Sequence, residues 1–196
     1  MKEEQAAEEI LPVTEVDYKT SIDMLLKITA GNDHRLSDMA DNKAQILITV
    51  NSIILSAIIS LVLGRLRDTQ YLIIPSFILL ATSLITLILA ILSTRPKLPN
   101  GKFTARDLSS KRVNLLFFGN FYRMKIKDYS SGMTHILTDD SFLYESLIKD
   151  SYAQGVVLGR KYRLLRLAYN VFMFGLIIVI LVFLQSIILD HNLFNK

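Results

Sequence analysis

The chain has 196 residues, a formal net charge of +4 and no cysteine, which excludes disulfides, thiolate nucleophiles and thiolate metal ligands. About half of the residues are hydrophobic (51%), and residues 44–64, 69–94 and 167–189 form three runs without a charged side chain. At about 1.5 Å of helical rise per residue, each run is long enough to cross the roughly 30 Å hydrocarbon core of a bilayer. We therefore expect a mainly α-helical membrane protein with three transmembrane helices.

The first 43 residues precede the first predicted span. Residues 1–12 are polar and rich in glutamate, which predicts a flexible N-terminus and not the basic start of a secretory signal. Residues 13–43 form a predicted cytoplasmic helical segment that ends its first helix at Gly31 and Asn32 and packs against the loop domain described below. Its apolar face consists of Val16, Ile22, Leu25, Leu26 and Ile28.

The first span, residues 44–64, carries a polar stripe that continues below the membrane. At 100° per residue its members share one face of a helix. They are Asp38, Asp41, Gln45, Thr49, Ser52, Ser56 and Ser60. Two interpretations stay open: small and hydroxylated side chains allow close helix packing, or they line a water-filled path after assembly, with the two aspartates attracting cations at its mouth.

The second span, residues 69–94, has a thinner stripe of hydroxyl side chains. These are Ser76, Ser83, Thr86 and Ser93, and Pro75 lies near the outer end. Only a short segment separates this span from the first one. We expect the two spans to form a tight hairpin.

Residues 95–166 form the predicted cytoplasmic loop domain and stalk helix. This segment contains fourteen basic and six acidic side chains, whereas residues 1–43 contain five basic and ten acidic ones. Lysine and arginine accumulate on the cytoplasmic side of a membrane, and several of them flank the second and third spans directly. The predicted topology places the N-terminus and the large loop in the cytoplasm, and residues 64–68 and the tail 190–196 outside.

Within the loop, residues 113–118 are an apolar run that fits either a strand or a short helix, and residues 127–137 predict a short helix. Residues 138–141 offer N-cap side chains for a long helix over residues 142–189 that includes the third span, residues 167–189. One face of its lower part carries Tyr144, Ile148, Ser151, Gly155, Leu158, Tyr162 and Leu165. Such a stalk is suited to transmit a cytoplasmic event to the membrane.

Motifs of enzymes and metal sites are missing from the sequence. It contains no GxxxxGK[ST], HExxH or GxSxG motif, and its three histidines are far apart. Asp139 and Asp140 are a possible carboxylate pair, but adjacent acids at a helix start favour capping. His34 beside Asp33 has no second histidine near it and fits a solvated residue. We therefore expect no catalytic residue, no metal and no cofactor.

The middle of the loop contains a mixture of aromatic and basic side chains. They are Lys111, Arg112, Phe117, Phe118, Phe121, Tyr122, Arg123, Lys125 and Lys127. Such a mixture suits stacking on a base and pairing with a phosphate, or a small core whose cations rest on anionic lipid headgroups. From these residues alone, the headgroup interpretation is favoured.

Three ordered segments, Asn32 to Ser56, Asn114 to Phe121, and Lys161 to Arg166 running into the last span, resemble the transmembrane effector family of Pycsar anti-phage systems. The resemblance covers about residues 20–190. It implies a bacterial inner-membrane effector that is activated by cyclic CMP or cyclic UMP from a companion pyrimidine nucleotide cyclase, impairs membrane integrity and causes abortive infection. Some relatives carry a phosphohydrolase-like domain ahead of this unit, and we expect neither that domain nor its hydrolase activity in this chain.

On this basis we expect a homo-oligomer in the lipid bilayer that binds a cyclic pyrimidine nucleotide and no nucleic acid. The candidate ligand-binding residues are Arg35, Lys43, Arg112, Phe117, Phe118, Asn120 and Arg123. The alternative function is a constitutive membrane scaffold or partner-binding subunit without a nucleotide ligand. In that case the polar stripe packs helices and the loop docks protein or lipid.

Overall fold

The computed structural model describes residues 15–62, 70–96, 101–104, 106–107, 110 and 114–194, and these residues contain four α-helices and no β-strand. The helices are α1 (Glu15–Val62), α2 (Ile73–Thr94), α4 (Ile126–Leu137) and α5 (Asp140–Phe194). Short 3₁₀ helices occupy Gln70–Leu72 and Phe118–Asn120. The predicted flexible residues 1–12 and the predicted outer segment 64–68 lie outside the described residues.

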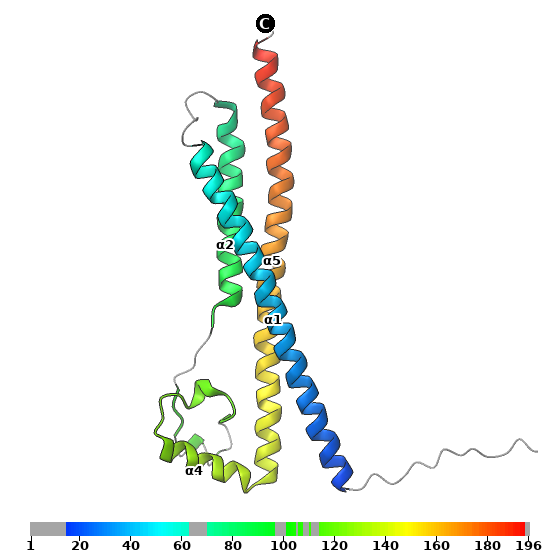
Figure 1. Ribbon diagram of the computed structural model, residues 1–196, viewed down its shortest axis with the longest axis vertical. Coiled ribbons are helices and arrows are strands. Elements are labelled where there is room, and N and C mark those ends of the chain that lie inside the picture. Colours follow the sequence, from blue (N-terminus) through cyan, green and yellow to red (C-terminus); the bar gives the residue numbers. More distant parts are fainter. Residues whose placement is uncertain are drawn as a thin grey trace, which may run out of the picture.

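Three of these helices, α1, α2 and α5, are long and apolar enough to cross a membrane. They pack pairwise into a bundle in which α1 crosses α5 at an angle, while α2 lies along both (Figure 1). The start of α1 and the segment with α4 lie at one end of the molecule, and the C-terminal end of α5 lies at the other (Figure 1). The prediction of a mainly helical chain with three spans is therefore confirmed.

Small side chains allow this close packing. Ala44 of α1, Ala90 of α2 and Ala168 of α5 are fully buried in one cluster, together with Ala40 and Leu47. Higher in the bundle, a Cβ atom on Gly175 of α5 would lie 2.0 Å from Cγ2 of Thr82 in α2. Because small residues let helix backbones approach closely, these positions set the distances between the three helices.

The predicted helix stop at Gly31 and Asn32 is wrong, because α1 runs without interruption from Glu15 to Val62. A glycine inside a helix costs only about 1 kcal/mol relative to alanine, and established helix on both sides propagates through such a position. The expected contact between the lower part of α1 and the loop is wrong as well. The stalk part of α5 lies between them, and Leu25 and Ile28 are exposed (Figure 1).

The long C-terminal helix is confirmed and is longer than predicted, since α5 continues to Phe194 through most of the expected outer tail. The predicted helix over 127–137 is present as α4. Leu115 of the loop, Ile136 of α4 and Phe142 of α5 form a small buried cluster, with Phe103, Met133 and Leu143 against it. In the predicted run 113–118, residues 115–117 are neither strand nor α-helix but bends that lead into the 3₁₀ turn at Phe118–Asn120, because this short run folds around the buried Leu115.

Candidate functional site

The polar stripe of α1 lies on the side of the helix that faces away from α2 and α5. The packed face of α1 carries Ala40, Ala44, Leu47 and Asn51, all buried. At 100° per residue, the stripe is centred on nearly the opposite side. Its exposed members are Asp38, Gln45, Thr49, Ser52, Ser56 and Ser60, while Asp41 is partly buried. A single chain therefore leaves a polar face uncovered along a membrane-spanning helix.

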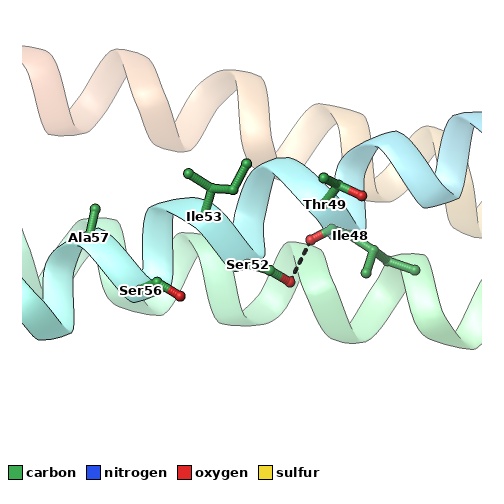
Figure 2. A pocket seen from close by; sticks show the side chains of 6 residues that line it. All are labelled: Ile48, Thr49, Ser52, Ile53, Ser56 and Ala57. Carbon is green, nitrogen blue, oxygen red and sulfur yellow. Dashed lines mark hydrogen bonds between the residues drawn. The ribbon is translucent and has the colours of Figure 1, made fainter.

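Two shallow hollows follow this face. One of about 660 Å³ is lined by Ile48, Thr49, Ser52, Ile53, Ser56 and Ala57, and Figure 2 shows that all six come from α1. The other, of about 450 Å³, is lined by Asn42, Gln45, Ile46, Thr49 and Val50. Since one helix supplies every wall, both hollows are open at the side and suit contact with a neighbouring element more than enclosure of a small molecule.

One hydroxyl of the stripe already has a partner within its own helix. The Ser52 hydroxyl donates to the Ile48 carbonyl at 2.8 Å (Figure 2). Such a bond back to the preceding turn lowers the cost of placing a serine in a low-dielectric environment. Ser52 therefore tolerates an environment that changes between lipid, protein and water.

The predicted stripe of α2 has a different role, because three of its four members are buried inside the bundle. Ser83, Thr86 and Ser93 are at most 5% exposed, and the Thr86 hydroxyl donates to the Thr82 carbonyl at 2.8 Å. For the second span, the packing interpretation of the stripe is therefore the one that fits. The α1 stripe is not packed in this way.

Asn51 is a buried polar residue that the sequence did not single out. Its amide nitrogen donates to the Leu47 carbonyl at 2.8 Å, while its Oδ1 has no hydrogen-bond partner among the described residues. The buried Ser83 hydroxyl is also without a partner in this part of the chain. A polar atom without a hydrogen bond costs free energy inside a membrane, so these two groups lower the stability of this packing of the bundle.

An ion pair joins the stalk to α1 just below the predicted first span. The Lys161 ammonium of α5 donates to both carboxylate oxygens of Asp41, at 2.9 and 2.7 Å, and to the Ser37 hydroxyl at 2.9 Å. One residue on, the Tyr162 hydroxyl donates to the Leu36 carbonyl at 3.2 Å. Lys161 is only 18% exposed, so this pair is better shielded from water than a surface salt bridge.

A second set of contacts fastens the loop to the stalk. The Asn114 side-chain amide donates to Asp150 of α5 at 2.8 Å, and Gln154 donates to the other Asp150 oxygen at 2.6 Å. Asn114 Oδ1 accepts the backbone N–H of Leu116 at 2.9 Å. Together with the buried cluster around Leu115, these bonds couple the position of the loop to the position of the stalk.

The predicted aromatic and basic residues of the loop are partly exposed. The rings of Phe117 and Phe118 lie 5.0 Å apart, and Phe118 is 53% exposed. The Arg123 guanidinium lies 5.6 Å from the centre of the Tyr122 ring, in the range of a cation–π contact. Asn120 has a structural partner, because its amide donates to the Asn114 carbonyl at 2.6 Å. The Tyr122 ring is itself 46% exposed, so an exposed ring and a guanidinium lie next to each other in the loop.

The remaining candidate ligand residues do not join this group within one chain. Arg35 and Lys43 are exposed on α1, and the lower part of α1 diverges from the segment with α4 (Figure 1). Arg112 lies outside the described residues. Sequence reasoning also missed Asn114 and Asp150 as the fastening of the loop, since a contact across 36 residues leaves no local pattern.

The acidic residues that raised the question of chemistry have structural roles. Asp139 Oδ1 accepts the backbone N–H of Phe142 at 3.1 Å, so Asp139 caps α5 as expected. His34 Nε2 lies 3.9 Å from Asp38, and both side chains are more than 60% exposed. In the part of the chain that the structure describes, no group of three histidine, cysteine or acidic side chains is placed to hold a metal ion.

The fold and these contacts define a class of protein: a helical membrane protein with three spans, whose loop is fastened to a long stalk and whose first span carries an uncovered polar face. The family model of the Pycsar effector protein domain matches residues 24–188. Since this match covers most of the chain, the protein belongs to the Pycsar effector family and has an effector role in antiviral defence. No curated protein sequence and no solved structure matches the chain significantly.

Proposed function

We propose that this protein is a Pycsar effector of the bacterial inner membrane that cyclic CMP or cyclic UMP activates and that then impairs membrane integrity, which causes abortive infection. The observation that carries the proposal is the exposed polar face of α1 in a helix long and apolar enough to span a bilayer. Lipid covers such a face poorly, whereas water or other copies of the chain cover it well. A companion pyrimidine nucleotide cyclase supplies the ligand.

The nucleotide is proposed to bind at the loop. Phe118 offers an exposed ring for stacking, and the Arg123 guanidinium offers a charge-assisted hydrogen bond to the cyclic phosphate. The strongly basic charge of residues 95–166 supports a cytoplasmic location, which is where a cyclase product is available. Asn120 then holds the local backbone through Asn114 and does not contact the base.

The signal is proposed to travel through the stalk. Ligand at the loop shifts α5 through Asp150, and α5 shifts α1 through Lys161 and Asp41. A ligand changes an equilibrium only through its different affinities for the two states, so the loop must bind nucleotide more tightly when the stalk is in its active position. Copies of the chain then bring their polar faces together, because three spans alone do not enclose a conduit.

Equilibrium binding of labelled cyclic CMP and cyclic UMP to the full chain in lipid nanodiscs tests the proposed site. Arg123→Ala should weaken binding about tenfold or more, since a charge-assisted hydrogen bond contributes about 1.5–3 kcal/mol and tenfold in affinity is about 1.4 kcal/mol. Phe118→Ala should weaken binding by a similar factor, because stacking of a base on an aromatic ring contributes about 1–3 kcal/mol. Arg160→Ala, which removes an exposed cation from the stalk, is the matched control. Unchanged affinity in both loop variants would reject this site.

A further inference from the structure

A second row of exposed side chains runs along α1, beside the polar stripe. Its members recur at every seventh residue: Tyr18, Leu25, Asn32, Met39, Ile46 and Ile53. The five members other than Asn32 are large hydrophobic or aromatic residues, and their exposed fractions lie between 44% and 64%. We call these six residues the α1 seam. In the part of the chain that the structure describes, neither α2 nor α5 covers it.

Lipid cannot cover the lower half of the seam. Met39 precedes the charged Asp41 and Lys43, which mark the start of the first predicted span, and Tyr18 lies about 38 Å along the helix before Lys43. Here α1 diverges from α5 and from the loop (Figure 1). Apolar side chains in this position face either water or another protein, and burial of each against a protein contributes about 1.5–3 kcal/mol.

The spacing and the membrane together indicate what covers the seam. Helices that wind around one another carry apolar side chains at two positions of each seven-residue repeat, and the seam supplies one of these two positions. Copies of one membrane protein insert in the same direction, so their α1 helices are parallel and can align in register. Asn32 fits this arrangement, because a single polar residue at such a position fixes the register of a parallel coiled coil.

Charge complementarity across the seam supports a second copy as the occupant. Asp38 directly precedes Met39 and Lys43 follows it by four residues, so the two charges lie on opposite flanks of the seam. In a parallel coiled coil, the residue before one seam position faces the residue five positions further on in the partner helix. We infer that copies of this chain contact one another along the α1 seam, with Asp38 of one copy against Lys43 of the next.

The proposed function requires copies of the chain to associate. The seam is where they associate, and its biological role rests on that proposed function. Asp38, Gln45 and Ser52 each come one residue before a seam position, at Met39, Ile46 and Ile53. By the same rule these stripe residues face Lys43, Val50 and Ala57 of the partner helix, so association along the seam covers one edge of each polar stripe. The seam is narrow, since the positions three residues further on include Arg35 and Asn42. Because a narrow contact buries little apolar area, the free energy of ligand binding is enough to form or disrupt it.

The chain has no native cysteine, so a single introduced cysteine reports one position without background. Leu25→Cys and Met39→Cys should cross-link efficiently into a covalent dimer when the full chain in membranes is oxidised. Ala30→Cys, exposed on the opposite face of the same helix, is the matched control and should not cross-link, although its copies still associate. Disulfides form only where the two Cα atoms lie about 4.4–6.8 Å apart. Equal yields at Ala30 and Leu25, or no dimer at Leu25 and Met39, would overturn the inference.

Charge reversal tests the pairing independently. In the Leu25→Cys background, Asp38→Lys and Lys43→Asp should each lower the cross-linked fraction several-fold, and the double change should restore it because the charges are again opposite. No recovery in the double variant counts against the pairing. Cross-linking that persists while no nucleotide causes leakage supports the seam and rejects the proposed function. Leakage with nucleotide, together with no cross-link along the seam in its presence or absence, supports the proposed function and rejects the seam.

Discussion

Lys161 and Asp41 are 120 residues apart in the sequence, yet their side chains form an ion pair with a shortest distance of 2.7 Å between Nζ and Oδ2. The pair joins the stalk part of α5 to α1 just before α1 becomes apolar. It links the stalk, to which the loop with the proposed nucleotide site is fastened, to Asp41 near the lower end of the polar stripe, where the membrane effect is proposed to occur. A change in α5 that reaches α1 has this contact as a direct route.

Removal of this pair should loosen α1 from the stalk. Lys161→Met and Asp41→Asn are each expected to lower the free energy of unfolding in detergent by about 1–3 kcal/mol, between the values for exposed and buried pairs. Because both changes remove the same interaction, the loss in the double variant should be smaller than the sum of the two single losses. Additive losses would show that the ion pair contributes no coupling energy.

The contact between Gly175 and Thr82 predicts a strong effect of one added methyl group. A Cβ at Gly175 would meet the Thr82 side chain at 2.0, 2.7 and 2.9 Å, so Gly175→Ala should separate α2 from α5 and lower thermal stability. Gly155→Ala is the control, since nothing lies within 4 Å of its added Cβ. It should be neutral or stabilise α5 by up to about 1 kcal/mol.

A second-site change checks that this effect arises from the crowded contact. Thr82→Ala removes the atoms at 2.0 and 2.7 Å but keeps the Cβ at 2.9 Å. In the Gly175→Ala background it should therefore recover part, and not all, of the lost melting temperature. If Gly175→Ala melts at the wild-type temperature, the close approach of α2 and α5 is not present in the folded protein.

The fastening of the loop to the stalk predicts a local effect. Asp150→Ala removes the acceptor of Asn114 and Gln154 and should expose the segment around Leu115 to proteolysis at a rate several-fold above wild type. Glu145→Gln is the control, because its partner Lys149 lies on the same helix surface and such pairs contribute about 0.3–0.5 kcal/mol. Equal cleavage of both variants would contradict the role given to Asp150.

Replacement of the polar stripe should abolish the membrane effect while the protein is still expressed. Replacement of Asp38, Thr49 and Ser56 together by leucine should abolish leakage and cellular toxicity, because the stripe would no longer be wetted. Gln185→Leu, a polar residue exposed on α5, is the control and should leave both unchanged. Toxicity that persists in a well-expressed triple variant would count against a path-lining role for these residues.

Much of the fold could be predicted from the sequence because the membrane imposes long apolar helices, and the runs at 44–64, 69–94 and 167–189 satisfy that requirement without tertiary information. The Asp139 cap and the helix after it could also be predicted from neighbouring residues in the sequence. The stop expected at Gly31 was wrong because a glycine only weakens a helix whose neighbours propagate it.

The candidate site was harder to predict because it depends on which helix faces meet. The stripes on α1 and α2 look alike in the sequence, yet Ser83 and Thr86 are buried while Thr49 and Ser56 are exposed. Likewise, the pairing of Lys161 with Asp41 depends on where α1 crosses α5. The periodicity of one helix does not identify which other helix of the chain packs against which of its faces.

Leakage of dye from liposomes that contain the purified full chain tests the central claim most directly. Release is measured with cyclic CMP, cyclic UMP, cyclic AMP or no nucleotide. The account predicts release with a cyclic pyrimidine nucleotide and none with cyclic AMP or without ligand. No release with either pyrimidine, together with no detectable nucleotide binding, would contradict it and favour a membrane scaffold.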